Sequence, residues 1–221
     1  MSSAPSSTTL TPQQIFDYAW NTLESEQGKV QFPKEILWLN GSPGAGKGTH
    51  TKTIKKVKGY KTDSIEMSSL FKTSEIKAMM DKGILIDDKT TTLLLFRELT
   101  KPQYAEGVIM DGYPRTIPQA DVVRLLAKKL AGKSLFQVIA LMVGEQESVR
   151  RQTQRAGEDK AAGKPVRATD LDPELARKRY KTFMESSYAA LESLASDFQF
   201  HSIETMGTIE EVGAKIAKTL K

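Results

Sequence analysis

The chain has no cysteine among its 221 residues, and it has only two histidines and two tryptophans. Without cysteine it can form no disulfide and can hold no metal through thiolates. Long hydrophobic runs are also absent, because the longest, 138–143, is far shorter than the roughly 20 residues that span a bilayer. We therefore expect no transmembrane segment and no membrane partner.

A strong excess of one charge is missing as well: 32 Lys and Arg residues face 27 Asp and Glu residues, which leaves a net charge of +5. That balance suits a polyanionic ligand. The basic residues form no dense tract, and no platform of basic and aromatic side chains accompanies them. The sequence thus predicts a small-molecule ligand rather than nucleic acid. Its length and its apolar content of 39% fit one α/β domain with excursions, or two small domains.

The first 34 residues differ in character from the rest of the chain. Residues 1–10 are rich in Ser, Thr, Ala and Pro and predict a disordered tail. They have neither the apolar stretch of a secretory signal nor the arginines of a transit peptide, so we expect a cytoplasmic protein. Thr11-Pro12-Gln13-Gln14 predicts the capped start of an extra helix that ends at Gln27-Gly28. Its apolar face has helical spacing and consists of Ile15, Phe16, Ala19, Trp20 and Leu23.

A glycine-rich stretch has the sequence Gly41-Ser42-Pro43-Gly44-Ala45-Gly46-Lys47-Gly48-Thr49. It follows the apolar run 35–40 and precedes a Lys-rich segment of helical length, the context in which this pattern indicates phosphate binding. Glycines let several backbone N–H groups point at one anion, and the helix N-terminus adds its positive dipole. Lys47 can then reach the β- and γ-phosphates of a nucleotide, and Thr49 can offer its hydroxyl to a magnesium ion.

Strand and helix patterns alternate along the chain. We expect strands at 35–40, 64–66, 107–111, 135–143 and 198–203. We expect a helix of about ten residues after the glycine-rich stretch, and further helices at 68–80, 89–98, 117–131, 145–154 and 209–220. Another helix begins near Pro173, with an apolar stripe of Tyr180, Met184, Tyr188, Leu191 and Ala195. Three helix-breaking residues (Gly157, Gly163 and Pro165) within 156–166 predict a mobile loop. The alternation predicts a five-stranded parallel sheet with helices on both faces, the three-layer α/β sandwich of P-loop NTPases.

A second motif, Asp111-Gly112-Tyr113-Pro114-Arg115-Thr116-Ile117-Pro118-Gln119-Ala120, follows the third strand. Asp111 ends a buried strand, so in a parallel sheet it lies beside the glycine-rich loop, where it can hold a magnesium-bound water near Thr49. Arg115 leaves a rigid turn, which fixes a planar and always charged donor for a phosphate. The same arginine could instead form an ordinary surface salt bridge.

The two motifs together resemble the adenylate kinase family of nucleoside monophosphate kinases. The similarity is collinear from about Glu35 to the C-terminus. Members of this family transfer the γ-phosphoryl group of ATP to a nucleoside monophosphate, and the adenylate members make two ADP from ATP and AMP. The resemblance implies a single kinase domain over 35–221, with a helical acceptor-binding insertion at about 66–97 and a short lid at about 155–168. Short-lid members are usually monomers.

The resemblance also implies roles for individual residues. The catalytic residues would be Lys47, Arg115, Arg155, Arg167 and Arg179. ATP would be bound by Gly44, Ala45, Gly46, Lys47, Gly48, Thr49, Arg151, Arg155 and Ile209. AMP would be bound by Met67, Lys72, Ile84, Leu85, Ile86, Gly112, Tyr113, Arg115, Gln119, Arg167 and Arg179. The cofactor Mg2+ would be held by Thr49 and Asp111, partly through water.

Two stretches depart from the family pattern. Met67 stands where a hydroxyl is common near the acceptor base, and Lys72 replaces an arginine that grips the acceptor phosphate at two points. A lysine is a point charge and cannot reproduce that fork. The other departure is Asp170-Leu171-Asp172, where the family more often has adjacent aspartates. These two carboxylates either pair with lid arginines or are solvated residues at a helix start.

Several functions remain open from the sequence. The leading hypothesis is an AMP kinase, because Gln119 lies where adenylate kinases place a glutamine against the adenine. A UMP/CMP-type kinase is the nearest rival, although that group usually has asparagine at this position. Lys72 and Met67 also allow a catalytically weak ATP-binding module that acts through a partner. A nucleic-acid-binding ATPase is the least favoured alternative.

Overall fold

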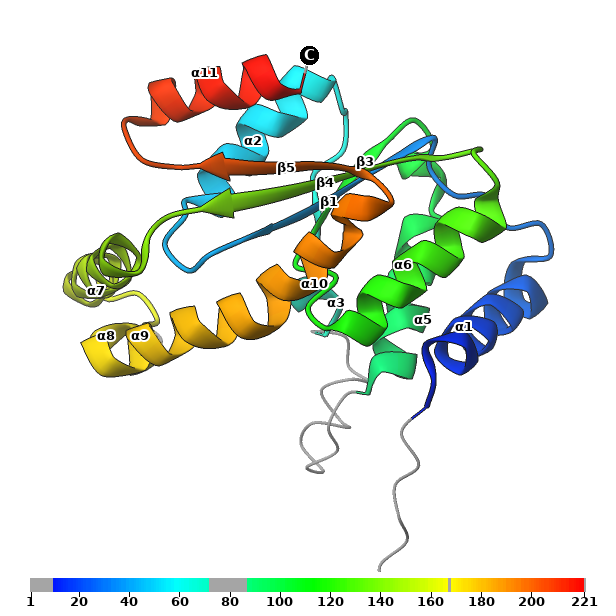
Figure 1. Cartoon of the computed structure of the whole chain (residues 1–221), viewed down its shortest axis with the longest axis horizontal. Coiled ribbons are helices and arrows are strands. Elements are labelled where there is room, and N and C mark those ends of the chain that lie inside the picture. Colours follow the sequence, from blue (N-terminus) through cyan, green and yellow to red (C-terminus); the bar gives the residue numbers. More distant parts are fainter. Residues whose placement is uncertain (1–9, 72–86, 167, 221) are drawn as a thin grey trace, which may run out of the picture.

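The computed structural model describes residues 10–71, 87–166 and 168–220, and these ranges form a three-layer α/β fold (Figure 1). The central sheet has five parallel strands in the order β2-β3-β1-β4-β5. Their bounds are β1 Glu35–Gly41, β2 Ile65–Glu66, β3 Val108–Asp111, β4 Leu135–Met142 and β5 Gln199–Glu204. The predicted sheet is therefore confirmed, and each strand end agrees with its predicted position or differs from it by one residue.

Helices cover both faces of the sheet (Figure 1). They are α1 Pro12–Gln27, α2 Lys47–Lys58, α3 Met67–Leu70, α5 Asp88–Leu99, α6 Ile117–Leu130, α7 Glu145–Ala161, α8 Ala168–Leu171, α9 Pro173–Thr182, α10 Ala189–Ser193 and α11 Ile209–Thr219. Short 3-10 turns lie at Pro102–Tyr104 and Leu194–Ser196, and a π-helical turn lies at Phe183–Tyr188. Among the described helices, none is long and apolar enough to cross a membrane.

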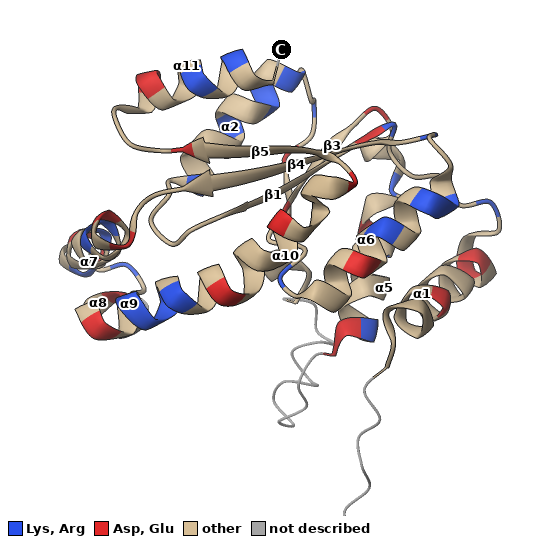
Figure 2. Cartoon of the chain, viewed as in Figure 1, with Lys and Arg blue, Asp and Glu red and all other residues tan. Residues whose placement is uncertain are grey.

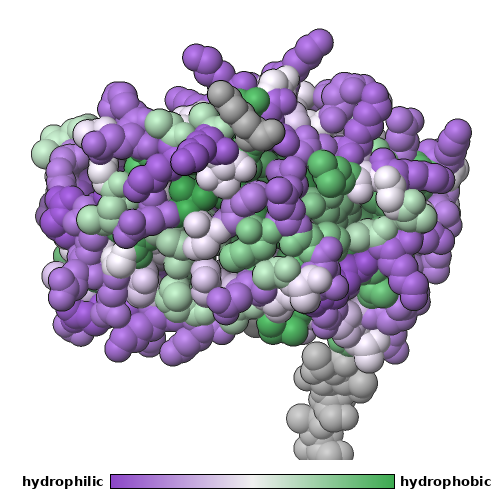
Figure 3. All heavy atoms as spheres, turned by 45° about the horizontal axis from the view of Figure 1, so that its top comes forward, coloured by the Kyte–Doolittle hydropathy of each residue, from purple (hydrophilic) through white to green (hydrophobic). Residues whose placement is uncertain are grey.

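Two apolar cores lie on the two faces because side chains alternate along each strand. On β1, Leu37 and Leu39 join the core formed with α2 and α11, whereas Ile36 and Trp38 join the core formed with α1, α5, α6 and α10. All four side chains are fully buried. One outer face of the molecule is mostly hydrophilic around its outline and has a band of apolar residues across its middle (Figure 3).

The extra N-terminal helix, α1, packs on the second of these cores. Thr11 caps it and forms the predicted capping box with Gln14, and all five predicted apolar residues are buried. Trp20 stacks between Phe16 and Phe32, with ring centroids 5.7 and 5.8 Å apart. The tail predicted over 1–10 lies outside the described residues except for its last residue.

The mobile loop predicted at 156–166 is wrong over its first half, because α7 continues to Ala161. A single glycine costs a helix only about 1 kcal/mol, and the alanines and charged residues around Gly157 favour helix. Ala156 is buried, and Gln154 donates a hydrogen bond to Glu158 one turn later. The helix ends just before Gly163, whose φ of +67° suits glycine.

The apolar stripe predicted for the last long helix is partly wrong. Hydrogen bonds in the π-helical turn at Phe183–Tyr188 span five residues instead of the four of an α-helix, so the turn shifts the face of the helix beyond it. The buried positions are Ala176, Phe183, Ala190, Leu191 and Leu194, and Ala195 is exposed. The helix predicted at 68–80 is described only up to residue 71, where α3 has ended. The division into insertion and lid stays a prediction.

Candidate functional site

The glycine-rich loop joins the carboxyl end of β1 to the start of α2 and is tightly enclosed. Gly44 and Gly46 have φ of +78° and +71°, conformations that L side chains rarely adopt. A Cβ on Gly44 would lie 3.0 Å from the carbonyl oxygen of Ser148 and 3.3 Å from Cβ of Arg151. The backbone of α7 therefore leaves no room for a side chain here. The loop is thus a rigid backbone cradle at a helix N-terminus, as an anion site requires.

Lys47 and Asp111 meet beside this loop. The Nζ atom of Lys47 lies 2.5 and 2.7 Å from the two carboxylate oxygens of Asp111. The carboxylate ends β3, which pairs with β1 so that Asp111 lies opposite Leu39. Asp111 is only 6% exposed, and burial raises its pKa although the Lys47 charge acts in the other direction. The predicted proximity of Asp111 to the loop is correct. Thr49 is exposed in the first turn of α2.

Arg115 and Gln119 are fixed where the third strand leads into α6. Arg115 donates from Nε to the carbonyl of Gly112 at 2.8 Å. Burial lowers its pKa, and the Asp111 charge offsets part of that effect. Gln119 is 8% exposed in the first turn of α6, and its Oε1 accepts from the Arg115 backbone N–H at 2.8 Å. Its Nε2 donates to Oδ1 of Asp88 at 2.7 Å.

Tyr113 and Met67 form the buried wall next to Arg115. Tyr113 is 1% exposed, and its hydroxyl lies 3.4 Å from the hydroxyl of Thr92. Met67 is 2% exposed and belongs to the apolar core, and it lies beside Gly112. Met67 therefore provides an apolar packing surface beside Gly112, at a position where a hydroxyl was expected from the family pattern.

Arginines from α7 and α9 form the opposite side of the site. Arg151 donates to Glu147 at 2.6 Å, to the carbonyl of Gly44 at 3.4 Å and to the carbonyl of Thr205 at 3.1 Å. It therefore connects α7 to the glycine-rich loop. Hydrogen bonds from Arg150 and from Arg151 lower the pKa of Glu147 to about 2. Basic and acidic residues are interspersed on α7 and α9 (Figure 2).

One buried carboxylate joins two of these helices. Asp170 is 3% exposed and accepts from Arg155 of α7 at 3.0 Å and from Arg179 of α9 at 2.6 Å. Asp172 instead caps α9 by accepting from the backbone of Glu174 at 2.8 Å. Of the two roles considered for this pair of aspartates, the structure assigns the arginine pairing to Asp170 and the helix start to Asp172.

The other predicted site residues either make fewer contacts with the rest of the site or lie outside the described ranges. Ile209 is 59% exposed at the start of α11. Ala45 is buried within the loop, and Gly48 opens into solvent in α2. The predicted residues outside the described ranges are Lys72, Ile84, Leu85, Ile86 and Arg167.

The sequence patterns missed several residues that the structure brings to the site. Asn40 is buried, and it accepts from the Gly41 N–H at 2.9 Å and donates to the Pro114 carbonyl at 3.3 Å. Asn40 thus connects the two motifs. The only sign of this role in the sequence was a polar residue at the end of an apolar strand. His50 is 4% exposed behind Gly46, and burial lowers its pKa, with a smaller contribution from the Arg151 charge. Nothing in the sequence pattern distinguished His50 from a surface residue.

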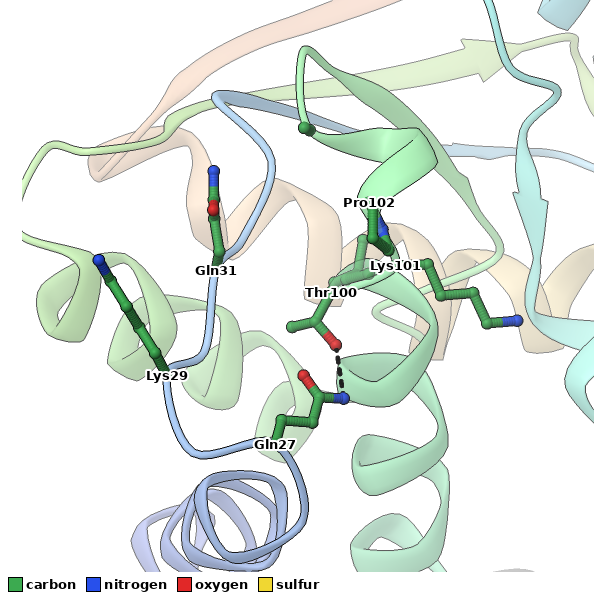
Figure 4. A pocket seen from close by; sticks show the side chains of 8 residues that line it. Gln27, Lys29, Gln31, Thr100, Lys101 and Pro102 are labelled. Carbon is green, nitrogen blue, oxygen red and sulfur yellow. Dashed lines mark hydrogen bonds between the residues drawn. The ribbon is translucent and has the colours of Figure 1, made fainter.

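A hollow of about 420 Å3 lies elsewhere, between the last turns of α1 and α5 (Figure 4). Gln27 donates across it to the hydroxyl of Thr100 at 3.2 Å. Lys29 and Gln31 line it just before β1 begins, so it lies at the amino edge of the sheet. The glycine-rich loop lies at the carboxyl edge, where parallel α/β sheets bind their ligands. This hollow is therefore separate from the candidate site.

Known proteins resemble the chain over most of its length. The family model described as adenylate kinase matches residues 39–197. Adenylate kinases from Brucella melitensis and Brucella anthropi are 36% and 37% identical to it over 193 residues, which are 83% of this chain and 97% of each relative.

Solved structures resemble it in fold. A gluconokinase from Sinorhizobium meliloti has a TM-score of 0.51 at 18% identity and covers 86% of this chain and 93% of its own. A sugar kinase from Janibacter has a TM-score of 0.52 at 17% identity, with coverages of 85% and 94%. These two likenesses bear on the fold alone. The match to the family model and the 36% identity show that the chain belongs to the adenylate kinase family and is a phosphotransferase, a kinase.

Proposed function

We propose that this kinase transfers the γ-phosphoryl group of ATP to AMP in a magnesium-dependent reaction that yields two ADP. The observation that carries the acceptor assignment is Gln119, a buried amide held beside the proposed phosphate ligand Arg115. A side-chain amide can donate to one atom of a base and accept from the next, which is how Gln recognises adenine. The names of the Brucella relatives agree with this acceptor.

The donor nucleotide would occupy the glycine-rich loop. Backbone N–H groups from Gly44 to Thr49 would surround its phosphates, and Lys47 would move from Asp111 to the β- and γ-phosphates. Arg151 already contacts the Gly44 carbonyl of the loop, which supports a role for it beside the bound ATP. Arg155 and Ile209 complete the proposed ATP side.

Mg2+ fits the residues present. Magnesium in kinases keeps several waters and takes one or two carboxylates or hydroxyls together with the phosphates of its substrate. Thr49 offers an exposed hydroxyl and Asp111 offers a carboxylate that ends a strand beside the loop. No cluster of three or more His, Asp or Glu side chains that could hold a metal alone occurs in the described ranges. When bound, the ion neutralises charge on the β- and γ-phosphates.

The acceptor would lie on the side of Arg115. Its guanidinium would pair with the AMP phosphate, together with Lys72, while Gly112, Tyr113 and Met67 form the adjoining wall. Ile84, Leu85 and Ile86 would line the base. Arg155, Arg167 and Arg179 would stabilise the charge that spreads over the transferring group, since phosphoryl transfer depends mainly on positioning and charge neutralisation. Closing the lid would exclude water and so protect ATP from hydrolysis.

A panel of acceptors tests this proposal. ADP formation is measured with ATP, Mg2+ and one of AMP, UMP, CMP or GMP, with and without a chelator of the metal. We expect AMP to give the highest kcat/KM and the chelator to stop the reaction. A preference for UMP or CMP would replace the proposal with the pyrimidine alternative, and tight ATP binding without turnover would indicate a binding module.

Two substitutions locate the reaction in this site. Lys47→Ala should lower kcat about 100-fold or more, the usual cost of losing one such charged donor, while circular dichroism shows an unchanged fold. Lys72→Arg should lower the KM for AMP because arginine can grip a phosphate at two points. An unchanged KM would remove Lys72 from the acceptor site.

A further inference from the structure

The Gln119 amide is held by two groups of opposite hydrogen-bonding character. The backbone N–H of Arg115 is only a donor, and it donates to Oε1 at 2.8 Å. The Asp88 carboxylate is only an acceptor, and it accepts from Nε2 at 2.7 Å. A side-chain amide can ordinarily turn over and exchange its oxygen and nitrogen. Here the turned amide would set N–H against N–H and oxygen against carboxylate, so only one orientation keeps both bonds.

Asp88 and the Gln119 amide that it holds come from separate elements. Asp88 is the first residue of α5, whose start is capped by Asp87, and Gln119 is in the first turn of α6. The two residues are 31 positions apart in the chain. Each anchored atom of the amide uses one hydrogen-bonding position, which leaves one N–H and one oxygen lone pair for a ligand. The orientation of this remaining pair is set by Asp88 together with the Arg115 backbone N–H, and not by the ligand.

A fixed amide separates bases into two classes. Adenine presents an amino donor next to a ring nitrogen acceptor, and cytosine presents the same order of groups. Hypoxanthine, guanine and uracil present a carbonyl acceptor next to a ring N–H donor, which is the reverse. Sites built to hydrogen-bond one pattern reject the other strongly because buried polar groups are left unpaired.

We propose that Asp88 is a positioning residue that fixes the orientation of Gln119 and thereby selects amino-bearing bases, such as adenine, over carbonyl-bearing bases of the same shape. The inference rests on the proposed function, because it takes Gln119 as the group that faces the acceptor base. AMP and inosine monophosphate form the matched pair of acceptors, since hypoxanthine has the size of adenine and the reversed order of groups.

The test compares three variants with the wild type, each assayed for kcat and KM with AMP and with inosine monophosphate. In Asp88→Leu, the leucine side chain is similar in size to that of aspartate but has no oxygen that can accept a hydrogen bond. Asp88→Asn keeps one carbonyl oxygen that can accept from Nε2. Asp87→Asn makes the same chemical change at the neighbouring residue, where asparagine still caps α5. Thermal unfolding of all four proteins reports any general loss of structure.

We expect Asp88→Leu to lower the ratio of kcat/KM for AMP over inosine monophosphate about tenfold, the effect of losing one hydrogen bond to a charged group, mainly through the KM for AMP. Asp88→Asn should recover most of that preference, and Asp87→Asn should behave as the wild type. A merely structural role for Asp88 would instead lower the rates with both acceptors equally, together with the unfolding temperature, and that result would overturn the inference.

The wild-type measurements separate the two proposals. If the wild type prefers AMP but Asp88→Leu leaves the acceptor ratio unchanged, the role of Asp88 is wrong and the proposed function stands. If the wild type prefers CMP, the proposed AMP activity is wrong, and the ratio of CMP to UMP then tests the same orientation. If the wild type does not discriminate between the two classes of base, the inference about Asp88 is wrong.

Discussion

At the scale of single residues, the site contains a buried carboxylate whose two arginine partners are partly exposed to solvent. Asp170 is almost wholly buried, whereas the side chains of Arg155 and Arg179 are 54% and 33% exposed. A carboxylate held in this way fixes the directions of two guanidinium groups that would otherwise move freely in water. Asp170 therefore orients both arginines, which we propose contact the transferring phosphate.

Asp170→Asn should lower the free energy of unfolding by about 1–2 kcal/mol, less than the cost of breaking a fully buried pair because both arginines reach water. Urea titration measures this loss. Asp172→Asn is the matched control, since asparagine caps a helix as well as aspartate does. Equal losses in the two variants would contradict the special role of Asp170.

The sequence could not distinguish these two aspartates. They are two positions apart, they both flank the start of a helix, and either could pair with an arginine. Burial decides between them, and burial depends on where α7, α8 and α9 meet. Asp88 was missed for a similar reason: its partner Gln119 lies on another helix, and no local pattern connects the two.

At the scale of elements, α7 extends beyond its predicted end at residue 154 and reaches Ala161. Gly157 lies inside it, and a Cβ added there would meet no heavy atom within 4 Å. Gly163 also has open space around it, but its backbone has a φ of +67°. Both positions have space for a methyl group, so the backbone conformation decides the effect of a substitution at each of them.

Gly157→Ala should raise the free energy of unfolding by about 0.5–1 kcal/mol, because alanine loses less backbone entropy in a helix. Gly163→Ala should lower it, because an L side chain is strained at positive φ. Denaturant titration of the pair gives both values. A destabilising Gly157→Ala substitution would mean that the helix ends before this residue.

The extra helix α1 gives a second comparison at this scale. Trp20 is 8% exposed between two aromatic rings, whereas Tyr18 on the same helix is 42% exposed. Trp20→Ala should cost about 3–5 kcal/mol of stability. Tyr18→Ala should cost less than about 1 kcal/mol, since it loses one exposed contact with the Lys89 amine. If both substitutions cost the same, α1 is not packed through this face.

The sequence predicted strands better than helix ends. The strand runs are apolar almost throughout because both faces of the sheet are covered, and such runs are easy to recognise. The end of α7 and the π-helical turn depend on small free-energy differences that tertiary packing overrides, so local breakers and periodicity were misleading there.

At the scale of the whole molecule, the parallel sheet brings together motifs that are far apart in the sequence. The strand order places β3 on one side of β1 and β4 on the other, so the second motif and α7 flank the glycine-rich loop. The position of Asp111 beside Lys47 could be predicted because carboxyl ends of parallel strands share one edge. Contacts between a strand and a loop, such as the hydrogen bond from Asn40 of β1 to the Pro114 carbonyl, could not be predicted.

The histidines contribute to the response of the whole fold to pH. Burial lowers the pKa of His201 below its ordinary value of 6.5, and the Lys58 charge acts in the same direction. The unfolded chain therefore binds more protons than the native state below pH 6.5, and stability falls as pH decreases through the native pKa. His201→Gln should make the loss of stability between pH 7 and pH 5 smaller. Urea midpoints at the two pH values measure it, and an equal loss in both proteins would contradict this assignment.

The position of α1 in the chain has a consequence for biosynthesis. Residues Pro12–Gln27 are synthesised before α5 and α6, which end at Leu99 and Leu130, yet they pack against both helices. A helix of 16 residues is marginal by itself in water. During translation the apolar face of α1 therefore stays exposed until about 100 further residues have been added, because domains generally fold as units. Helix α1 is thus synthesised well before the helices that bury its apolar face.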